Sequence, residues 1–525
     1  MANFSIHLVP PRARIRWLSF GFITFFISIG YHVSAQIVTG QVVSDTDQQP
    51  LPGVNVLMKG TTIGTVTDLD GNYRLDTTGE DTITFSYIGF VPQAVPVNGR
   101  SVIDITLAED VETLSEVVVV GYGTQQKRDL TGAVSSLRGE DLTSVPAPSP
   151  MQAMQGKVAG VQITSSSGAP GAAPLVRIRG VGTLNDASPL FVVDGVLLRD
   201  AEDINYLNSQ DIASMEVLKD ASATAIYGAR GANGVVIITT KSGTSDTPQL
   251  NVNLSYGLQT IPKRVDLLNG PQFAEIANEI FPGTYDPDTV ANTDWQDEVF
   301  RASAPILDAG LSFSGQSERL SYYVGFSYFG QEGVIPGSDF NRYTLRLNNT
   351  YQLTDNIRVG HNLTGARFKE AEGAGVVGSV LRARPTGVPF DRDGDFAELE
   401  GSGNPLASIA YNNNDNTRTQ IVGNVFTEID FLEDFTFRSS YGVDVNFGQR
   451  VGFTPVFFVS PLQRNQESQL TVTDRQRNRW FWENTLNYNK EIDRHRFGVL
   501  LGYTMQDERS ETLVAETRNL LRGDL

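Results

Sequence analysis

Residues 250–258, Leu-Asn-Val-Asn-Leu-Ser-Tyr-Gly-Leu, alternate apolar and polar side chains with a period of two. Such alternation is typical of a β-strand with one apolar face and one polar face. The same pattern returns downstream, in residues 322–328, 343–347, 357–363, 421–431, 435–445, 480–488 and 497–503. The C-terminal half of the chain therefore predicts roughly nine long antiparallel strands.

The connections between these strands are of two kinds. Short acidic or amide turns lie at 354–356, 432–434 and 491–493, and long stretches rich in Gly, Asn, Asp and Pro lie at 262–308, 366–418 and 448–477. Transmembrane β-strands need about 9–11 residues, with short turns on one side of the membrane and long loops on the other. Tyr, Phe and Trp near the strand ends suit the interfacial aromatic girdles. We expect a transmembrane antiparallel β-barrel.

The first 35 residues have the layout of a secretory signal. Three arginines between positions 12 and 16 precede the apolar run 17–29, and Val33-Ser34-Ala35 offers a cleavage site before Gln36. The alternative is an N-terminal membrane anchor, but this run is shorter than the ~20 residues that a spanning helix needs. No later segment reaches that length without charge. A membrane-spanning part must then be a closed barrel.

The composition excludes several classes of function. The chain has no cysteine, which excludes disulfides and thiolate metal centres. A net charge of -19 argues against a nucleic-acid partner. Beyond the leader only His361 and His495 remain, without a local nucleophile motif, so we expect no enzyme and no cofactor.

Residues 36–108 predict a small β-sandwich, with short alternating strands separated by Gly and Asp turns. The segments 39–43, 51–56, 67–73 and 83–90 resemble the carboxypeptidase-regulatory-like domain, a non-catalytic accessory domain. Within it, Asp68 and Asp70 could bind calcium, but the turn preference of Asp explains them better.

A run of four valines, Val117 to Val120, follows Glu116 and precedes Gly121-Tyr122-Gly123. Valine is a strong strand former, and the absence of alternation means that both faces require cover. One interpretation is an ordinary inter-domain strand. The other is a strand that adds itself to the edge of another protein's sheet, where backbone hydrogen bonds supply the affinity.

Residues 125–245 alternate short strands and turns in the manner of a compact α/β segment. Residues 221–228 predict a short helix of small residues that ends at Gly228 as a C-cap. Within the strand 176–180, Arg177 and Arg179 are expected on the same face.

Three stretches of this segment, 174–180, 190–196 and 212–234, resemble the plug signature of SusC/RagA-type TonB-dependent outer-membrane transporters. Residues 116–123 are similar to the segment that this family carries before its plug, where the TonB box lies. The resemblance therefore favours the docking strand, with Glu116, Val117, Val118, Val119 and Val120 as the candidate residues.

The resemblance implies active import of a large nutrient, a glycan or peptide oligomer, across the bacterial outer membrane. The partners that it implies are TonB with ExbB and ExbD, a SusD-like lipoprotein lid, and outer-membrane lipid. Arg177 and Arg179 could lock the plug by pairing with acidic residues on the barrel wall; alternatively they are a solvated face in a wet lumen. Two rival functions are a siderophore-type receptor and a secreted β-rich adhesin or carbohydrate-binding protein.

The fold class expected is mainly β: a carboxypeptidase-regulatory-like sandwich, an α/β plug and an incomplete barrel. The predicted division is 1–35 signal peptide, 36–108 sandwich, 109–124 TonB-box segment, 125–245 plug and 246–525 partial barrel. Plugged transporters have about 22 strands, so the chain is expected to be partial, with an edge strand prone to aggregation.

A last candidate site is the loop Asp391-Arg392-Asp393-Gly394-Asp395. Asp391, Asp393 and Asp395 resemble a calcium loop, although Gly394 stands two places early for an EF-hand. A solvated loop is the alternative and the favoured interpretation.

Overall fold

The computed structural model describes residues 36–520, apart from 60, 62, 78–80, 88, 109–116, 121–122, 127–132, 144–146, 166 and 493–494. The predicted signal peptide and Glu116 lie outside the described residues. The chain divides into two compact units, residues 1–116 and 117–525.

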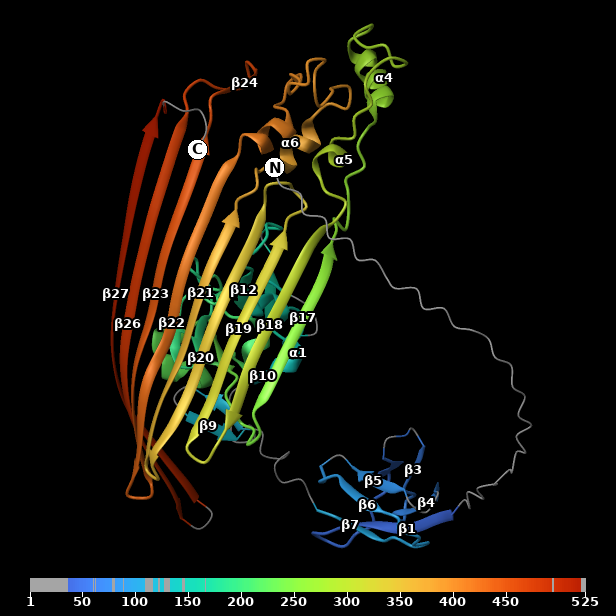
Figure 1. Ribbon diagram of the computed structural model, residues 1–525, viewed down its shortest axis with the longest axis vertical. Coiled ribbons are helices and arrows are strands. Elements are labelled where there is room, and N and C mark those ends of the chain that lie inside the picture. The colour runs from blue at the N-terminus through green and yellow to red at the C-terminus, as the bar shows by residue number, and fades with distance from the viewer. Residues whose placement is uncertain are drawn as a thin grey trace, which may run out of the picture. The chain divides into compact units, whose positions relative to one another are not determined.

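The first unit is a sandwich of two β-sheets (Figure 1). One sheet has the order β4-β1-β7 and the other the order β3-β2-β5-β6. The strands are β1 (Gln36–Ser44), β2 (Asn55–Met58), β3 (Gly64–Val66), β4 (Asn72–Thr77), β5 (Thr82–Ser86), β6 (Gln93–Pro96) and β7 (Ile105–Leu107). Their inward positions form a closed apolar core, in which the rings of Tyr73 and Phe85 meet edge to face at 5.2 Å. The predicted sandwich is confirmed.

The second unit contains the predicted plug, whose centre is a five-stranded sheet of order β10-β15-β16-β13-β14. The elements are β10 (Val134–Arg138), α1 (Gly139–Leu142), α2 (Pro150–Ala153), β11 (Val161–Thr164), β12 (Leu175–Ile178), β13 (Leu190–Val193), β14 (Val196–Leu198), η2 (Ser209–Asp211), β15 (Ile212–Leu218), α3 (Ala221–Thr224), η3 (Ala225–Gly231) and β16 (Val235–Thr240). The predicted Asp194-Gly195 turn joins β13 to β14, with positive φ at both residues.

One predicted element differs in detail. The α-helix α3 is a single turn, and the chain continues as the 3₁₀ segment η3 to Gly231. Gly228, predicted to cap the helix, lies inside that segment with φ 59° and ψ -146°. Glycine is needed there because an L side chain rarely adopts this conformation.

A nine-stranded antiparallel sheet follows, in which each strand pairs with the next along the chain. Its strands are β17 (Gln249–Gln259), β18 (Ala304–Gln316), β19 (Leu320–Glu332), β20 (Asp339–Thr354), β21 (Ile357–Ala371), β22 (Asn413–Phe431), β23 (Phe435–Thr454), β26 (Gln469–Ile492) and β27 (His495–Arg518). The number agrees with the predicted nine in the described part of the chain, but β18 corresponds to none of the eight alternating stretches and begins inside the predicted loop 262–308. The strands are longer than predicted, because residues assigned to loops at 366–371, 413–418 and 469–477 belong to them.

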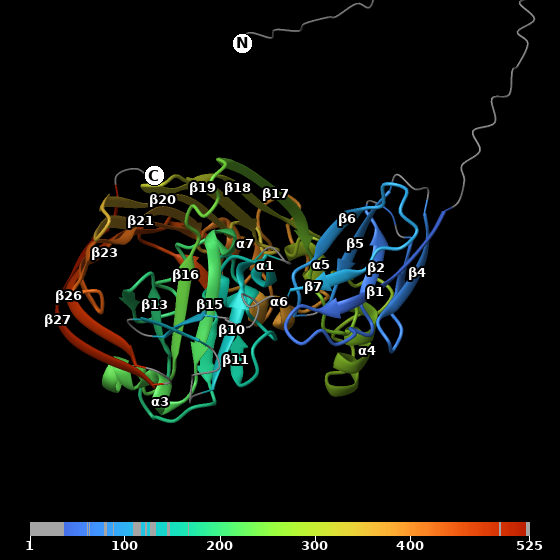
Figure 2. The same ribbon diagram turned by 90° about the horizontal axis from the view of Figure 1, so that it is seen from below.

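The sheet curves around the predicted plug, as the view from below shows (Figure 2). Strands β13, β15 and β16 lie on its concave side. The long connections carry short helices and a hairpin: α4 (Gly270–Ile280), α5 (Trp295–Val299), α6 (Val377–Arg382), α7 (Pro405–Ala410), β24 (Phe457–Ser460) and β25 (Gln463–Asn465). None of the described helices is long and apolar enough to cross a membrane.

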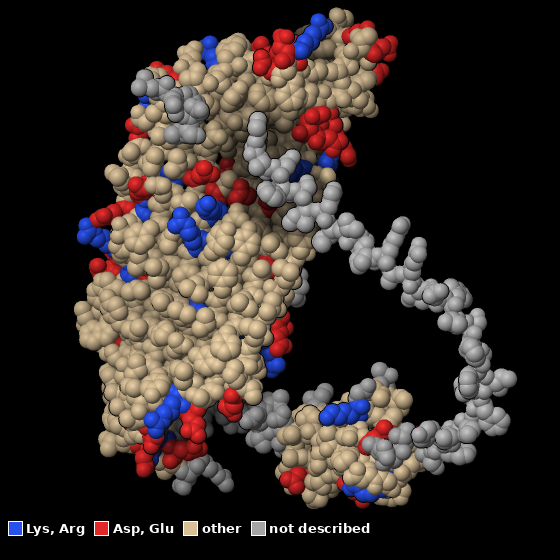
Figure 3. Space-filling model, in the orientation of Figure 1, with Lys and Arg blue, Asp and Glu red and all other residues tan. Residues whose placement is uncertain are grey.

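The convex face of the sheet carries exposed apolar side chains. On β17, for example, Leu250, Val252, Leu254, Tyr256 and Leu258 are all more than 60% exposed. Figure 3 shows the result as a band with few charged residues. A transmembrane strand has this pattern, in which the outward positions meet acyl chains.

The length of that apolar band is clearest on β27. Residues Phe497, Val499, Leu501 and Tyr503 are exposed on one face, and Met505 ends the run. The following outward positions are Asp507, Arg509 and Glu511. The apolar run thus spans 497–505, which fits the ~9–11 residues of a bilayer crossing, and the rest of the strand continues beyond it.

Candidate functional site: the interface between plug and sheet

Strand β20 presents two buried arginines to the plug. The guanidinium of Arg342 donates to the backbone oxygens of Pro148 at 2.8 Å and Asn205 at 2.6 Å. Four residues further on, Arg346 donates to the backbone oxygen of Asp211 at 3.1 Å. Both side chains are 1% exposed.

Arg346 also reaches side chains at the C-terminal ends of the plug strands β16 and β13. It hydrogen-bonds the hydroxyl of Thr240 and lies 3.6 Å from the carboxylate of Asp194. Asp194 is held in turn by the amide and hydroxyl of Thr240. The guanidinium is therefore buried with both charge and hydrogen-bond partners, as a buried ion requires.

The same face of β20 adds two neutral contacts. Thr344 donates its hydroxyl to the backbone oxygen of Tyr206 at 3.2 Å, and Asn348 donates to that of Lys241 at 3.0 Å. Alternation explains the set, because residues 342, 344, 346 and 348 share one face of a strand. The outward residues between them include Tyr343 and Leu345.

A second cluster joins the plug to strands β22, β23 and β26. Arg418 pairs with Glu202 at 2.7 Å, and Arg477 pairs with Asp203. Arg477 also lies 3.5 Å from the buried carboxylate of Asp444. Arginines on the sheet here meet acidic residues on the plug loop.

Strands β18 and β19 hold the plug with acceptors and a phenol instead. Asp308 accepts from the amide groups of Asn208 at 3.0 Å and Gln210 at 3.2 Å. The hydroxyl of Tyr323 donates to Asp211 at 2.6 Å. Next to them, amide and hydroxyl side chains border a polar cavity of about 570 Å³, whose lining includes Asn251, Asn253 and Ser312.

The interface between plug and sheet combines buried charges with apolar packing. A buried charge that loses its partner costs ~3–5 kcal/mol, so separation at the arginines is expensive in a dry site. Water entering the gap can replace the hydrogen bonds and ion pairs. The interface is also apolar in part, because Phe329, Phe340, Phe368 and Phe481 of the sheet belong to the same buried cluster as the plug core.

The predicted lock at Arg177 and Arg179 requires correction. Arg179 follows the end of β12 with φ 57°, so the two arginines do not share a strand face. Arg177 donates to Ser188 and Arg179 pairs with Asp220, both within the plug. In the wall contacts described above the arginines belong to the sheet, whereas one plug arginine, Arg199, pairs with Glu508 of β27.

Asp220 has a structural role of its own. Its carboxylate accepts from the backbone amide of Ala133 and from Arg179, and these bonds, the amide first, lower the pKa of Asp220 from its usual value. The Arg179–Asp220 pair thereby ties the end of β12 to the residues that precede β10.

The valine run forms β8 (Val117–Val120), which pairs with β9 (Gly123–Gln126) in an antiparallel two-stranded sheet. Within the described residues no further strand joins this sheet. Glu116, the remaining predicted docking residue, lies outside the described part. One long edge of β8 therefore has no described strand beside it.

The predicted calcium loop is held by its own backbone. The carboxylate of Asp391 accepts from the amides of Asp393 and Asp395, both at 2.9 Å, and Gly394 has φ 88°. In the part of the chain that the structure describes, no three acidic or histidine side chains converge as a metal site would require. The solvated loop stays the favoured prediction for these exposed residues.

Comparison with known proteins agrees with this architecture. Residues 38–119 match the CarboxypepD_reg-like domain family, and residues 126–235 match the TonB-dependent Receptor Plug Domain family. TonB-dependent receptor P26 of Formosa agariphila is 37% identical over 499 residues, covering 92% of this chain and 50% of that protein. TonB-dependent receptor SusC of Bacteroides thetaiotaomicron is 33% identical over 526 residues, covering 93% and 50%.

The chain is a homologue of the SusC-type TonB-dependent receptors. It spans about half the length of the curated relatives that it matches. Among solved structures, the RagAB peptide importer in the 'open-open' state superposes with a TM-score of 0.68 at 29% identity, covering 77% of this chain and 50% of that one. The ferric citrate transporter FecA, at 13% identity and a TM-score of 0.50, shares the fold alone. These relatives point to the outer membrane.

Arg342 and Arg346 were not predicted to contact the plug, although the sequence contains a signal for this contact. Arg342, Thr344, Arg346 and Asn348 are consecutive members of the polar face of a strand whose other face is Tyr343, Leu345 and Leu347. Two guanidinium groups on a lumen-facing surface indicate a partner inside the barrel.

Proposed function

We propose that this chain forms the plug and part of the barrel of an outer-membrane importer that takes up an oligomeric nutrient by a TonB-dependent mechanism. The observation that carries the proposal is the inverted sheet: its outer face is apolar, and its inner face places buried arginines on the backbone of an enclosed domain. No soluble protein gains from that arrangement. A plugged membrane cylinder requires it.

The work of import would arrive through β8. An outer membrane has no ATP, so force must be delivered by a periplasmic partner, which we propose to be TonB energised by ExbB and ExbD. TonB would add a strand to Val117–Val120, with Glu116 beside it. Added strands bind through backbone hydrogen bonds, which resist a pull along the strand together.

The cargo and the outer partner are proposed from the relatives. RagAB is named as a peptide importer, and a glycan is the other class of cargo that the resemblance implies. We propose a SusD-like lipoprotein as the lid over the long outer connections. The division into sandwich 36–108, TonB-box segment 109–124, plug 125–245 and barrel from 246 belongs to the same proposal.

The test is import by the full-length protein in its own bacterium, with two kinds of change in β8. Val118→Pro removes a backbone donor and should abolish uptake, because strand addition needs the main chain. Replacing all four valines by threonine keeps strand propensity and every backbone donor, and uptake should persist. Normal uptake by the proline variant would exclude β8 as the strand through which TonB pulls.

A heat-modifiable shift in gel mobility separates the importer from a secreted adhesin. A closed barrel resists detergent until it is boiled and then changes its mobility, whereas an adhesin does not. A full-length protein that is soluble without detergent would remove the membrane part of the proposal.

A further inference from the structure

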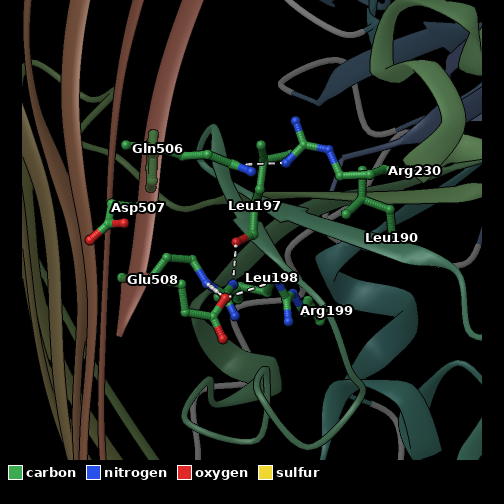
Figure 4. Close-up of a pocket in the computed structure, with 10 residues that line it drawn as sticks. Leu190, Leu197, Leu198, Arg199, Arg230, Gln506, Asp507 and Glu508 are labelled. Atoms are coloured by element: carbon green, nitrogen blue, oxygen red, sulfur yellow. Dashed lines mark hydrogen bonds and ion pairs between the residues drawn. The ribbon is translucent and has the colours of Figure 1, made fainter. Parts of the chain in front are cut away.

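A pocket of about 190 Å³ lies between the plug and the strands β26 and β27 (Figure 4). The plug lines it with Leu190, Leu197, Leu198, Arg199 and Arg230, and the two strands line it with Arg479, Phe481, Gln506, Asp507 and Glu508. The contacts that hold the plug do not fill this space.

Positive charge exceeds negative charge around the pocket. Guanidinium groups come from Arg199, Arg230 and Arg479. Glu508 pairs with Arg199 and Arg479, and Asp444 lies 3.8 Å from Arg479. Asp507 lies on the other side of its strand, away from Arg199 and Arg230 (Figure 4).

The three arginines differ in their hydrogen-bond and ion-pair partners. Glu508 accepts from Arg479 at 3.1 Å and lies 3.0 Å from Arg199 through the same oxygen. Arg230 donates to the neutral amide oxygen of Gln506 at 2.7 Å. Glu508 thus serves two guanidinium groups, with Asp444 as a more distant second carboxylate at 3.8 Å from Arg479, and Arg230 has an uncharged acceptor.

Arg479 shows the clearest deficit. Its side chain is 7% exposed, and its Nη2 atom is buried without a hydrogen-bond partner among the described residues. A buried charged donor left unpaired is costly. An acceptor entering beside Glu508 would reduce that cost.

The size and shape of the space suit a small oxyanion. A volume of 190 Å³ exceeds the ~30 Å³ that one water occupies in the liquid, so a carboxylate or sulfate group fits. Guanidinium forks match the geometry of such groups. Leu190, Leu197 and Phe481 form an apolar side, which favours an anion attached to a larger framework over a fully hydrated ion.

We infer that this pocket is a binding site for an oxyanion, a carboxylate or sulfate group, held by Arg230, Arg199 and Arg479. The apolar side points to an anionic group borne by the imported oligomer. That assignment of the source rests on the proposed import function; the binding chemistry stands on the pocket alone.

The test is calorimetric titration of the full-length protein in detergent with sodium sulfate at constant ionic strength. Saturable binding is expected for the native protein. Arg230→Gln removes an accessible guanidinium and should weaken binding about tenfold, the effect of one charged hydrogen bond. Glu508→Gln removes the competing carboxylate and should strengthen binding.

Opposite changes in sulfate affinity in these two variants distinguish a binding site from general damage to the fold, because a disturbed fold would weaken binding in both variants. Arg264→Gln, a change to an outer-connection arginine paired with Asp297, is the control and should leave the affinity unchanged. Absence of saturable binding in the native protein, or equal weakening in all three variants, overturns the inference.

A second arm identifies the source of the anion. A sulfated tetrasaccharide that competes with sulfate, when its desulfated counterpart does not, assigns the site to a group on the cargo. Failure of both to compete while sulfate binds assigns it to a free anion. If uptake fails to depend on β8 while sulfate still binds, the proposed function falls and the oxyanion site remains.

Discussion

The sandwich and the nine-stranded sheet use the same alternation for opposite purposes. In β4 of the sandwich the buried residues are Tyr73 and Leu75, and Arg74 and Asp76 are exposed. In β20 the buried residues are Arg342 and Arg346, and Tyr343 and Leu345 are exposed. Alternation identifies a strand, but only the chemistry of each face identifies what lies against it.

The largest effect expected is at the inner face of the sheet. Arg346→Met removes the guanidinium from Asp194 and from the backbone oxygen of Asp211, and should destabilise the seated plug by ~3–5 kcal/mol. Hydrogen exchange of the β16 amides in the full-length protein measures it. The control Arg367→Met changes an exposed arginine of β21 and should have little effect; equal acceleration in both would contradict a buried ionic interface.

The next test compares two exposed leucines. Leu254 on β17 is 75% exposed and Leu69 in the sandwich is 89% exposed. Leu254→Arg should cost ~2–4 kcal/mol, because the arginine would enter lipid, whereas Leu69→Arg should change stability by no more than ~0.5 kcal/mol. Urea unfolding of the full-length protein from lipid vesicles measures both, and a harmless Leu254→Arg would mean that β17 does not face acyl chains.

A smaller loss of stability tests the same contrast between a side chain in a protein core and one on the outer face of the sheet. Ile83→Val in the closed core of the sandwich should cost ~0.5–1.5 kcal/mol, because the core cannot collapse fully around the lost methyl group. Ile421→Val on the outer face of β22, where Ile421 is 39% exposed, should cost clearly less, since mobile acyl chains fill the space. Similar losses would indicate that a protein surface covers Ile421.

The smallest effect concerns the Arg179–Asp220 pair within the plug. The pKa of Asp220 is lowered in the folded chain, so its stabilisation is present above about pH 4 and is lost as the pH falls below that value. Asp220→Asn should remove this part of the acid sensitivity. Melting curves between neutral and acidic pH measure it, and unchanged acid sensitivity in the variant would assign it to other carboxyl groups.

The elements that the sequence predicted are those with a strong periodic pattern. Eight of the nine strands, the sandwich and the Asp194-Gly195 turn followed from alternation and turn chemistry, whereas β18 corresponds to none of the alternating stretches. Strand ends did not, because beyond the lipid a strand no longer needs apolar outward residues, and segments such as 469–477 look like loops.

The plug contacts could not be assigned from the sequence for a different reason. Strand alternation predicts Arg177 and Arg179 on one face, but the positive φ of Arg179 breaks the strand. On β20, the arginines that reach across, Arg342 and Arg346, bind backbone oxygens, and Arg346 adds the side chains of Thr240 and Asp194. A backbone acceptor leaves no trace in residue type, so no pairing rule on side chains could have found it.

That choice of acceptor has a consequence for how the protein can diversify. Every residue offers a peptide carbonyl, so the guanidinium groups of β20 grip positions 148, 205 and 211 whatever side chains stand there. At these three positions the side chains of the plug can therefore change without loss of the contacts with β20. The contacts at Asp194, Glu202 and Asp203, in contrast, depend on those side chains.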